Sequence, residues 1–305
     1  MTRFTGGVRF ASPANTAHGD SNVQASPPER PGAATAGHVG TTLPQYEVIA
    51  LKYATRDARR PANFIGGDPH DAAMPMDYFV WVLRDATRVV LVDTGFGEDM
   101  AAKRHRTLLR HPAAALELLG IRAADVPQVV ITHLHNDHAG RLSDYPNARF
   151  HIQDSEVAFA TGRHMCCGTA NRAYEPDHVC ALVRLVYGDR VDFHDGDAVL
   201  APGISVHRIG GHTDGLQAVR VHTARGWVVL ASDASHYYEH IEQDRCFPLV
   251  HSVGDVLQGY RRLRALAASP AHIVPGHDPE VLARYPSASP ELEGIAARLD
   301  LPPRA

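Results

Sequence analysis

The feature that most constrains this chain is a cluster of four potential metal ligands within six positions: His133, His135, Asp137 and His138. The apolar residues 129–132 precede it and are typical of a short strand buried on both faces. Alternate positions share one side of an extended segment, so the cluster can aim its side chains into one space. Imidazole and carboxylate are zinc ligands. Four of them exceed the needs of one open catalytic zinc, so the pattern indicates two metal ions that share the motif.

Three further candidate ligands each follow an apolar segment that is typical of a strand: His212, Asp233 and His277. These strands are expected over residues 204–209, 227–231 and 272–275. Ligands in α/β proteins gather at strand ends, so we expect these side chains to meet the first cluster. Glycine stands immediately before both histidines, where it permits a sharp turn or a close backbone approach.

The order of the predicted elements indicates an α/β layered architecture, because runs of strands alternate with helices. We expect strands at residues 46–51, 78–83 and 89–92, a helix at residues 100–119, and further helices after the histidine motif. Residues 1–43 are rich in Ala, Gly, Pro, Ser and Thr, and we predict a disordered N-terminal extension there. Residues 44–305 are then expected to form one domain.

Composition narrows the classes of partner. The formal net charge is -4, which gives no support to nucleic-acid binding. No apolar run is long enough to span a bilayer, and residues 1–42 lack the apolar core of a signal peptide, so we expect a cytoplasmic protein without a membrane partner. The chain could assemble as a homodimer, and the sequence does not distinguish this from a monomer.

Residues 46–285 resemble the metallo-β-lactamase superfamily, whose fold is an αββα four-layer sandwich. The resemblance is carried by five motifs: Asp93-Thr94-Gly95, His133-Leu134-His135-Asn136-Asp137-His138-Ala139-Gly140, Gly211-His212-Thr213, Ser232-Asp233-Ala234 and Pro275-Gly276-His277. It implies that one zinc ion is bound by His133, His135 and His212. It implies that the second is bound by Asp137, His138 and His277, that Asp233 bridges both, and that Asp93 holds the motif loop.

Within that superfamily the chain is most similar to the N-acyl-homoserine lactone lactonases, the quorum-quenching branch. The similarity implies that a hydroxide bridging two zinc ions attacks the carbonyl of a lactone ring, and that Asp137 returns the proton to the leaving oxygen. The branch often has a tyrosine three residues after the bridging aspartate. That position is His236 here, followed by Tyr237, and either side chain could assist at the substrate carbonyl.

Alternatives of the same fold share the metal set: a general lactonase or arylesterase, a phosphotriesterase, a glyoxalase-type thioesterase or a β-lactamase. A di-iron oxidoreductase is disfavoured, because such relatives carry glutamate at the position of His135. A nuclease is disfavoured by the acidic net charge. A non-catalytic metal-binding protein is disfavoured because every candidate ligand is present. Met74, Met76 and residues 165–174 could receive an acyl chain, or could equally pack in the core.

Overall fold

The computed structural model describes residues 42–304, which belong to one compact unit, and residues 1–41 of the predicted extension lie outside the described part. Two β-sheets lie face to face. The first has the order β13-β1-β2-β3-β5-β6-β7, with β4 beside β1. The second has the order β12-β11-β10-β9-β8. The strands of the first sheet are β1 Glu47–Arg56, β2 Met76–Arg84, β3 Val89–Val92, β4 Thr107–Leu108, β5 Gln128–Val130, β6 Arg149–Gln153, β7 Val191–His194 and β13 Ala296–Arg298. Those of the second are β8 Ala198–Ala201, β9 Ile204–Arg208, β10 Gln217–Thr223, β11 Gly226–Ser232 and β12 Ile273–Pro275.

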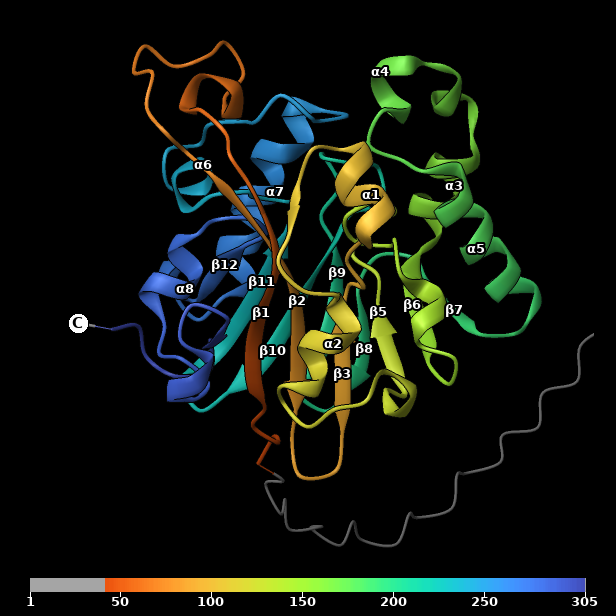
Figure 1. The fold of residues 1–305 in the computed structure, drawn as a ribbon, viewed down its shortest axis with the longest axis vertical. Helices are drawn as coiled ribbons and strands as arrows, with labels where there is room; N and C mark the ends of the chain where they lie inside the picture. The colour runs from red at the N-terminus through yellow and green to blue at the C-terminus, as the bar shows by residue number, and fades with distance from the viewer. Residues whose placement is uncertain (1–41, 305) are drawn as a thin grey trace, which may run out of the picture. The chain divides into compact units, whose positions relative to one another are not determined.

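Helices cover the outer face of each sheet. Their bounds are α1 Glu98–Lys103, α2 Pro112–Glu117, α3 Asp154–Thr161, α4 Gly168–Asn171, α5 Pro176–Tyr187, α6 Tyr238–Glu242, α7 Val253–Leu266 and α8 Glu280–Arg284. In Figure 1, α1 and α2 lie in front of the first sheet, and the strands of the second sheet lie behind it. None of the helices in the described range combines the length and apolarity that crossing a membrane requires.

The layers follow from the alternation of side chains along each strand. In β1, Ile49 and Leu51 point to the face covered by α1, α2, α3 and α5, and Val48 and Ala50 point toward the second sheet. The apolar layer between the sheets includes the fully buried Trp81. On the far side, α7 packs on β10 and β11 in a third apolar cluster. The predicted αββα four-layer sandwich is therefore confirmed.

Strand direction brings the site together. In the first sheet β3, β5, β6 and β7 are mutually parallel, so the segments after β3 and β5 leave the same edge of the sheet. In the second sheet β12 runs parallel to β11, and their carboxyl ends also coincide. Because β9 and β11 are both antiparallel to β10, the segment after β9 leaves the same edge. The segments that follow β3, β5, β9, β11 and β12 contain the predicted ligands or their supports.

The prediction of a single helix over residues 100–119 is wrong. The structure has α1, the short strand β4 and then α2 in this region. His105 takes a left-handed conformation with φ 52°, just after the end of α1. Pro112 has no backbone N–H and occupies the first turn of α2, where none is needed. The apolar spacing resembles one helix because two short helices pack on the same face of the sheet.

Candidate metal centre

The histidine motif lies in a loop directly after β5, and a buried carboxylate fixes the shape of that loop. Asp93, at the end of β3, accepts hydrogen bonds from the backbone N–H and the hydroxyl of Thr132, both at 2.8 Å. The same carboxylate accepts a bond from Nδ1 of His138 at 2.7 Å. Asp93 itself has φ 62°, a conformation that non-glycine residues seldom adopt. These bonds tie both ends of the motif to the first sheet.

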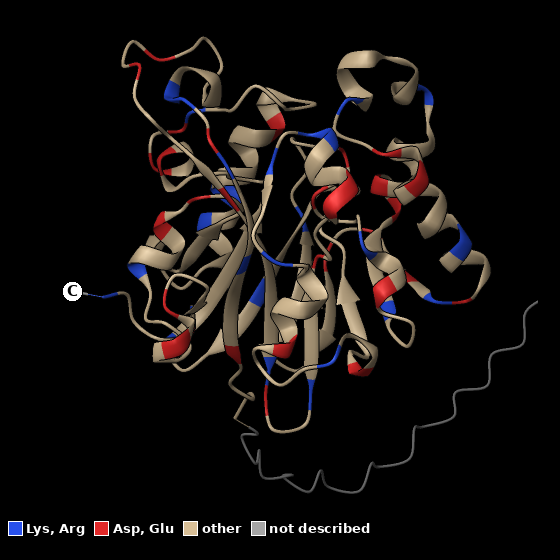
Figure 2. Cartoon of the chain, in the orientation of Figure 1, with Lys and Arg blue, Asp and Glu red and all other residues tan. Residues whose placement is uncertain are grey.

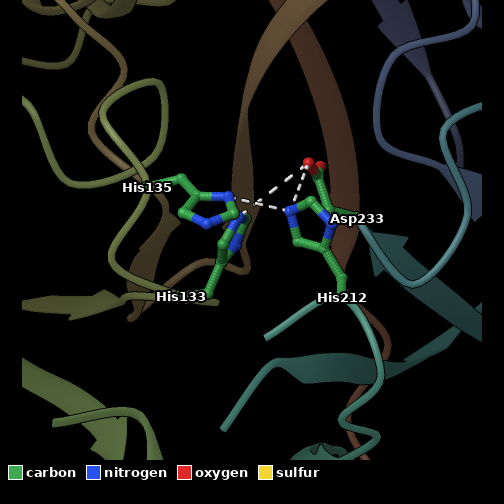
Figure 3. A group of neighbouring side chains, drawn as sticks. All are labelled: His133, His135, His212 and Asp233. Carbon is green, nitrogen blue, oxygen red and sulfur yellow. Dashed lines mark hydrogen bonds and ion pairs between the residues drawn. The ribbon is translucent and has the colours of Figure 1, made fainter. Parts of the chain in front are cut away.

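The predicted ligands lie close together in two groups. In the first group the ligand atoms lie within 4.8 Å of one another, and its members are His133, His135, His212 and Asp233 (Figure 3). The second group, with the same limit, consists of Asp137, His138 and His277. The structure therefore brings together in space all the side chains that the sequence motifs select as ligands.

The carboxylate of Asp233 lies between the two groups. Its Oδ2 is 3.2 Å from Nε2 of His212 and 3.9 Å from Nε2 of His133. Its Oδ1 is 3.2 Å from Nε2 of His138 and 2.9 Å from Nε2 of His277. Each oxygen thus faces a different group, which is the arrangement that a carboxylate shared by two cations requires.

The hydrogen-bond pattern leaves ring nitrogens available for cations. Nδ1 of His212 donates to the carbonyl oxygen of Leu249 at 2.6 Å, and Nδ1 of His277 donates to that of Asp77 at 2.9 Å. An imidazole that donates from Nδ1 presents the lone pair of Nε2, the form that binds metals. Among the candidate ligand side chains, three buried atoms have no hydrogen-bond partner: Nε2 of His133, Nε2 of His138 and Oδ1 of Asp233. Because buried polar atoms are ordinarily paired, these atoms fit a metal centre.

The electrostatics of the group favour positive charge in its middle. Burial lowers the pKa of His133 and of His135 well below the usual value, so both rings are neutral. Burial also lowers the pKa of His138, but Asp233, Asp93 and Asp137 outweigh it and raise that pKa well above the usual value. The carboxylates therefore favour positive charge at His138. A divalent cation would satisfy the same field.

Close backbone packing requires glycine beside two of the ligands. A Cβ atom at Gly276 would lie 2.8 Å from Oδ1 of Asp233, so a side chain there would displace the carboxylate. Gly211 has φ 88°, and a Cβ atom there would lie 2.6 Å from the backbone nitrogen of Val256. The glycines singled out in the sequence thus let His212 and His277 approach the other ligands.

His236 and Tyr237 differ in where their polar atoms lie. Nε2 of His236 is 3.1 Å from Oδ2 of Asp233, and its ring stacks on Phe247 with the ring centroids 3.6 Å apart. Burial lowers the pKa of His236 to about 3. The hydroxyl of Tyr237 donates instead to the carbonyl oxygen of Met74 at 3.1 Å. Of the two, His236 alone lines the cavity beside the metal groups, and the predicted substrate contact of Tyr237 gains no support.

That cavity has a volume of about 370 Å³ and is open to solvent on one side. Five of the residues around it belong to or touch the metal groups: His135, Asp137, Asp233, His236 and His277. Met76 also lines it, whereas Met74 and Met165 line other pockets. Of the candidates for the acyl-chain site, Met76 and, from residues 165–174, Arg172 and Ala173 therefore lie beside the metal groups.

Sequence reasoning missed Glu156, a fully buried carboxylate in the first turn of α3. Its Oε1 accepts bonds from the backbone N–H of Leu134 at 2.8 Å and from the hydroxyl of Tyr174 at 3.0 Å. Its Oε2 accepts from the hydroxyl of Thr213 at 2.6 Å and from the backbone N–H of Gly215 at 3.2 Å. Glu156 therefore connects the loop of His133 and His135 to the loop of His212. Acidic residues are common in the first turn of helices, so nothing in the sequence marks it.

Comparison with known proteins agrees with this geometry. The sequence model of the family described as Metallo-beta-lactamase superfamily matches residues 74–284, more than half of the chain. The N-acyl homoserine lactonase AttM of Azorhizobium caulinodans is 30% identical over 179 residues, which are 57% of this chain and 66% of that protein. A probable metallo-hydrolase of Mycobacterium tuberculosis is 29% identical over 215 residues, 64% of this chain and 69% of that protein. The match to AttM thus spans just under two thirds of its length.

Solved structures share the fold. A quorum-quenching N-acyl homoserine lactone lactonase superposes with a TM-score of 0.65 at 21% identity, covering 78% of this chain and 94% of that one. AidC, described as a dizinc quorum-quenching lactonase, superposes with a TM-score of 0.61 at 17% identity, covering 77% of this chain and 88% of that one. At these identities the likeness establishes the αββα fold.

Proposed function

The chain belongs to the metallo-beta-lactamase superfamily, and from this premise we propose that it is a metal-dependent hydrolase that opens the ester ring of lactones, N-acyl-homoserine lactones among them. The observation that carries the proposal is the position of Asp233, whose two oxygens face two separate groups of ligand atoms. The similarity to N-acyl homoserine lactonases supports the choice of reaction and substrate.

We assign His133, His135 and His212 to one cation, Asp137, His138 and His277 to a second, and Asp233 to both. Neutral imidazoles and carboxylates suit zinc, which is the metal that we propose. Two such cations supply Lewis-acid activation of a water molecule and of the ester carbonyl. The residues named here would hold them beside the cavity, which is lined by His135, Asp137, Asp233 and His277.

Other side chains handle the substrate and the proton. Burial raises the pKa of the Asp137 carboxyl, but Arg106 and the neighbouring histidines outweigh it and hold that pKa below its usual range. Asp137 is therefore ionised in the resting site, and we assign to it the transfer of a proton to the oxygen that leaves the acyl carbon. His236 is neutral at pH 7 and lines the cavity, and we assign to its Nε2–H a hydrogen bond to the substrate carbonyl oxygen, in place of its contact with Oδ2 of Asp233.

A substrate panel with metal analysis tests this proposal. Purified protein is assayed with N-hexanoyl-homoserine lactone, γ-butyrolactone, an aryl ester, a β-lactam and paraoxon, and its metal content is measured in parallel. We expect kcat/KM to be highest for a lactone, with two zinc ions per chain. Faster turnover of a non-lactone, or activity that persists after complete metal removal, would contradict the proposal.

Substitution of one ligand tests the assignment of the site. His135→Ala should lose bound metal and at least about 99% of the activity, because removal of a ligand or its support commonly costs 10–100-fold or more. His70→Ala is the matched control, since the His70 side chain is 80% exposed and lies outside the cavity. An active, fully loaded His135→Ala protein would remove His135 from the ligand set.

A further inference from the structure

The cavity beside the metal groups is rich in arginine, although the chain as a whole has a formal net charge of -4. Four guanidinium groups line it: Arg56, Arg104, Arg106 and Arg172. Its acidic lining residues are Asp137 and Asp233, and both belong to the metal groups. Figure 2 shows lysine and arginine positions on several segments at the end of the domain where α1 and α4 lie. The cavity lining therefore carries four guanidinium groups and two carboxylates.

Two of these arginines have their charge matched by the protein. Nη1 of Arg106 is 3.6 Å from Oδ2 of Asp137 and bonds Oδ1 of Asn136 at 2.9 Å. Nη2 of Arg104 is 3.7 Å from a carboxylate oxygen of Glu175, which lies outside this cavity. The charges of these two guanidinium groups are thus balanced by carboxylates of the protein itself.

The other two have no such match. Among residues 42–304, no carboxylate lies within 4.0 Å of the guanidinium nitrogens of Arg56 or Arg172. Nη2 of Arg56 lies 2.8 Å from the sulfur of Met76, a weak acceptor, and its Nε is buried without a partner. Arg56 is half-buried, so its unpaired charge costs free energy unless a ligand supplies the anion, whereas Arg172 is exposed and its charge is hydrated. Arginine at a cavity wall suits a carboxylate, which it can bind with two parallel bonds.

Both arginines lie on segments that are fixed to the metal groups. Arg56 ends β1 and pairs with Met76 at the start of β2. The next residue of β2, Asp77, accepts the Nδ1 bond of His277. On the other side, the carbonyl oxygen of Ala173, the neighbour of Arg172, accepts a bond from the backbone N–H of Asn136 at 2.9 Å. A carboxylate held by either guanidinium would therefore lie at a set position relative to the metal ligands.

We propose that the substrate of this site is a compact ester or lactone that carries a carboxylate, and that Arg56 and Arg172 bind that carboxylate and determine specificity. This inference rests on the proposed metal-dependent hydrolysis of lactones, and within that class it favours substrates other than the N-acyl-homoserine lactones, which carry no carboxylate. The volume of about 370 Å³ suits a small substrate. Hydrolysis adds one water across the acyl C–O bond and yields a hydroxy acid with a second carboxylate, so the product is a dianion.

A matched pair of lactones tests the proposal by turnover. The pair is 5-oxooxolane-2-carboxylate and its carboxamide, which have nearly the same shape and differ in charge. We expect the metal-loaded protein to prefer the carboxylate in kcat/KM by about tenfold or more, the usual effect of a charge-assisted hydrogen bond. Arg56→Gln and Arg172→Gln should each reduce this preference severalfold or more, and Arg56→Lys should retain part of it. Arg122→Gln is the control, because that guanidinium is exposed and pairs with Asp125 at the surface.

Equal kcat/KM for the two lactones, or an unchanged ratio in both glutamine variants, would overturn the proposal while leaving the lactonase function intact. A second measurement does not depend on turnover. Calorimetry should show that 2-hydroxyglutarate, the ring-opened dicarboxylate, binds the wild-type protein about tenfold more tightly than it binds Arg56→Gln. If no lactone is hydrolysed but this difference appears, the lactonase function fails and the anionic specificity stands. Equal affinity of wild type, Arg56→Gln and Arg172→Gln for 2-hydroxyglutarate would overturn the proposed anionic specificity.

Discussion

Glu156 and Asp93 are buried carboxylates that act on the candidate metal centre through the loops that carry the ligands. Asp93 bonds Thr132 and His138, at the two ends of the histidine motif. Glu156 bonds Leu134, between two of the ligands, and Thr213, beside a third. Burial raises the pKa of both carboxyls, and hydrogen bonds from their neighbours oppose that effect. Each buried carboxylate is thus stabilised by its hydrogen-bond donors, and it fixes the position of the loops that carry those donors.

Glu156→Gln tests this positioning role. The amide nitrogen of glutamine would face donors at one of the two oxygen positions, so we expect the free energy of unfolding to fall by about 2 kcal/mol. Metal affinity should fall with it, because the loops of His135 and His212 would no longer be joined. Denaturant unfolding and metal titration measure the two effects. Glu117→Gln, at an exposed position of α2, should change neither. An unaltered metal affinity in Glu156→Gln would exclude the positioning role.

At the scale of elements, the pairing of β6 and β7 joins two histidines at one edge of the first sheet. His151 of β6 and His194 of β7 have nearly parallel rings with 5.4 Å between centroids, and Nδ1 of His151 is 3.2 Å from Nε2 of His194. Burial and the neighbouring His194 lower the pKa of His151 to about 4. The packing at this edge therefore requires a neutral His151. Protonation of that ring in acid should lower the stability of the folded protein.

The pH dependence of stability follows from that pKa. Above pH 6.5 the ring is neutral in both folded and unfolded chains, so its contribution is fully present. Between pH 6.5 and about 4 the unfolded chain binds a proton that the folded chain does not, so stability falls as the pH falls. The effect should amount to about 2–3 kcal/mol. The free energy of unfolding is measured with urea at pH 7.5 and at pH 5. Its decrease between the two pH values should be smaller in His151→Gln than in wild type or in His70→Gln. Equal losses in all three proteins would refute the assignment.

At the scale of the whole molecule, the candidate ligands join the two sheets. Four of them follow β5 of the first sheet, whereas His212, Asp233 and His277 follow strands of the second. The layer between the sheets is otherwise apolar. Cations held by this ligand set would therefore connect the two halves of the sandwich at one edge.

Metal removal should consequently lower thermal stability. A cation at 100 times its Kd stabilises the folded state by about 2.7 kcal/mol, which in a domain of this size corresponds to a fall in Tm of roughly 5–10 °C on its removal. Scanning calorimetry before and after dialysis against a chelator, with metal content measured, tests this. Restoring zinc should restore Tm. An identical Tm for stripped and loaded protein would show that the sheets are held without the cations.

The candidate ligand residues and the family can be recognised from the sequence, because their signals are local. The spacing of His133, His135, Asp137 and His138 after an apolar strand lies within ten positions, and the strand periodicity that orders the sandwich is equally short in range. The helix predicted over residues 100–119 fails for a related reason, since apolar spacing does not reveal the break at His105 and Pro112.

Only the tertiary structure decided which polar side chains support the ligands and which charges line the cavity. The bond from Thr213 to Glu156 joins residues 57 positions apart, and no local pattern encodes such a contact. Likewise Arg56 and Arg172 border one cavity only because β1 and the segment after α4 fold to the same edge of the sheets. Adjacent residues such as His236 and Tyr237 diverge for the same reason: the backbone turns between them, and packing settles which side chain reaches the metal groups.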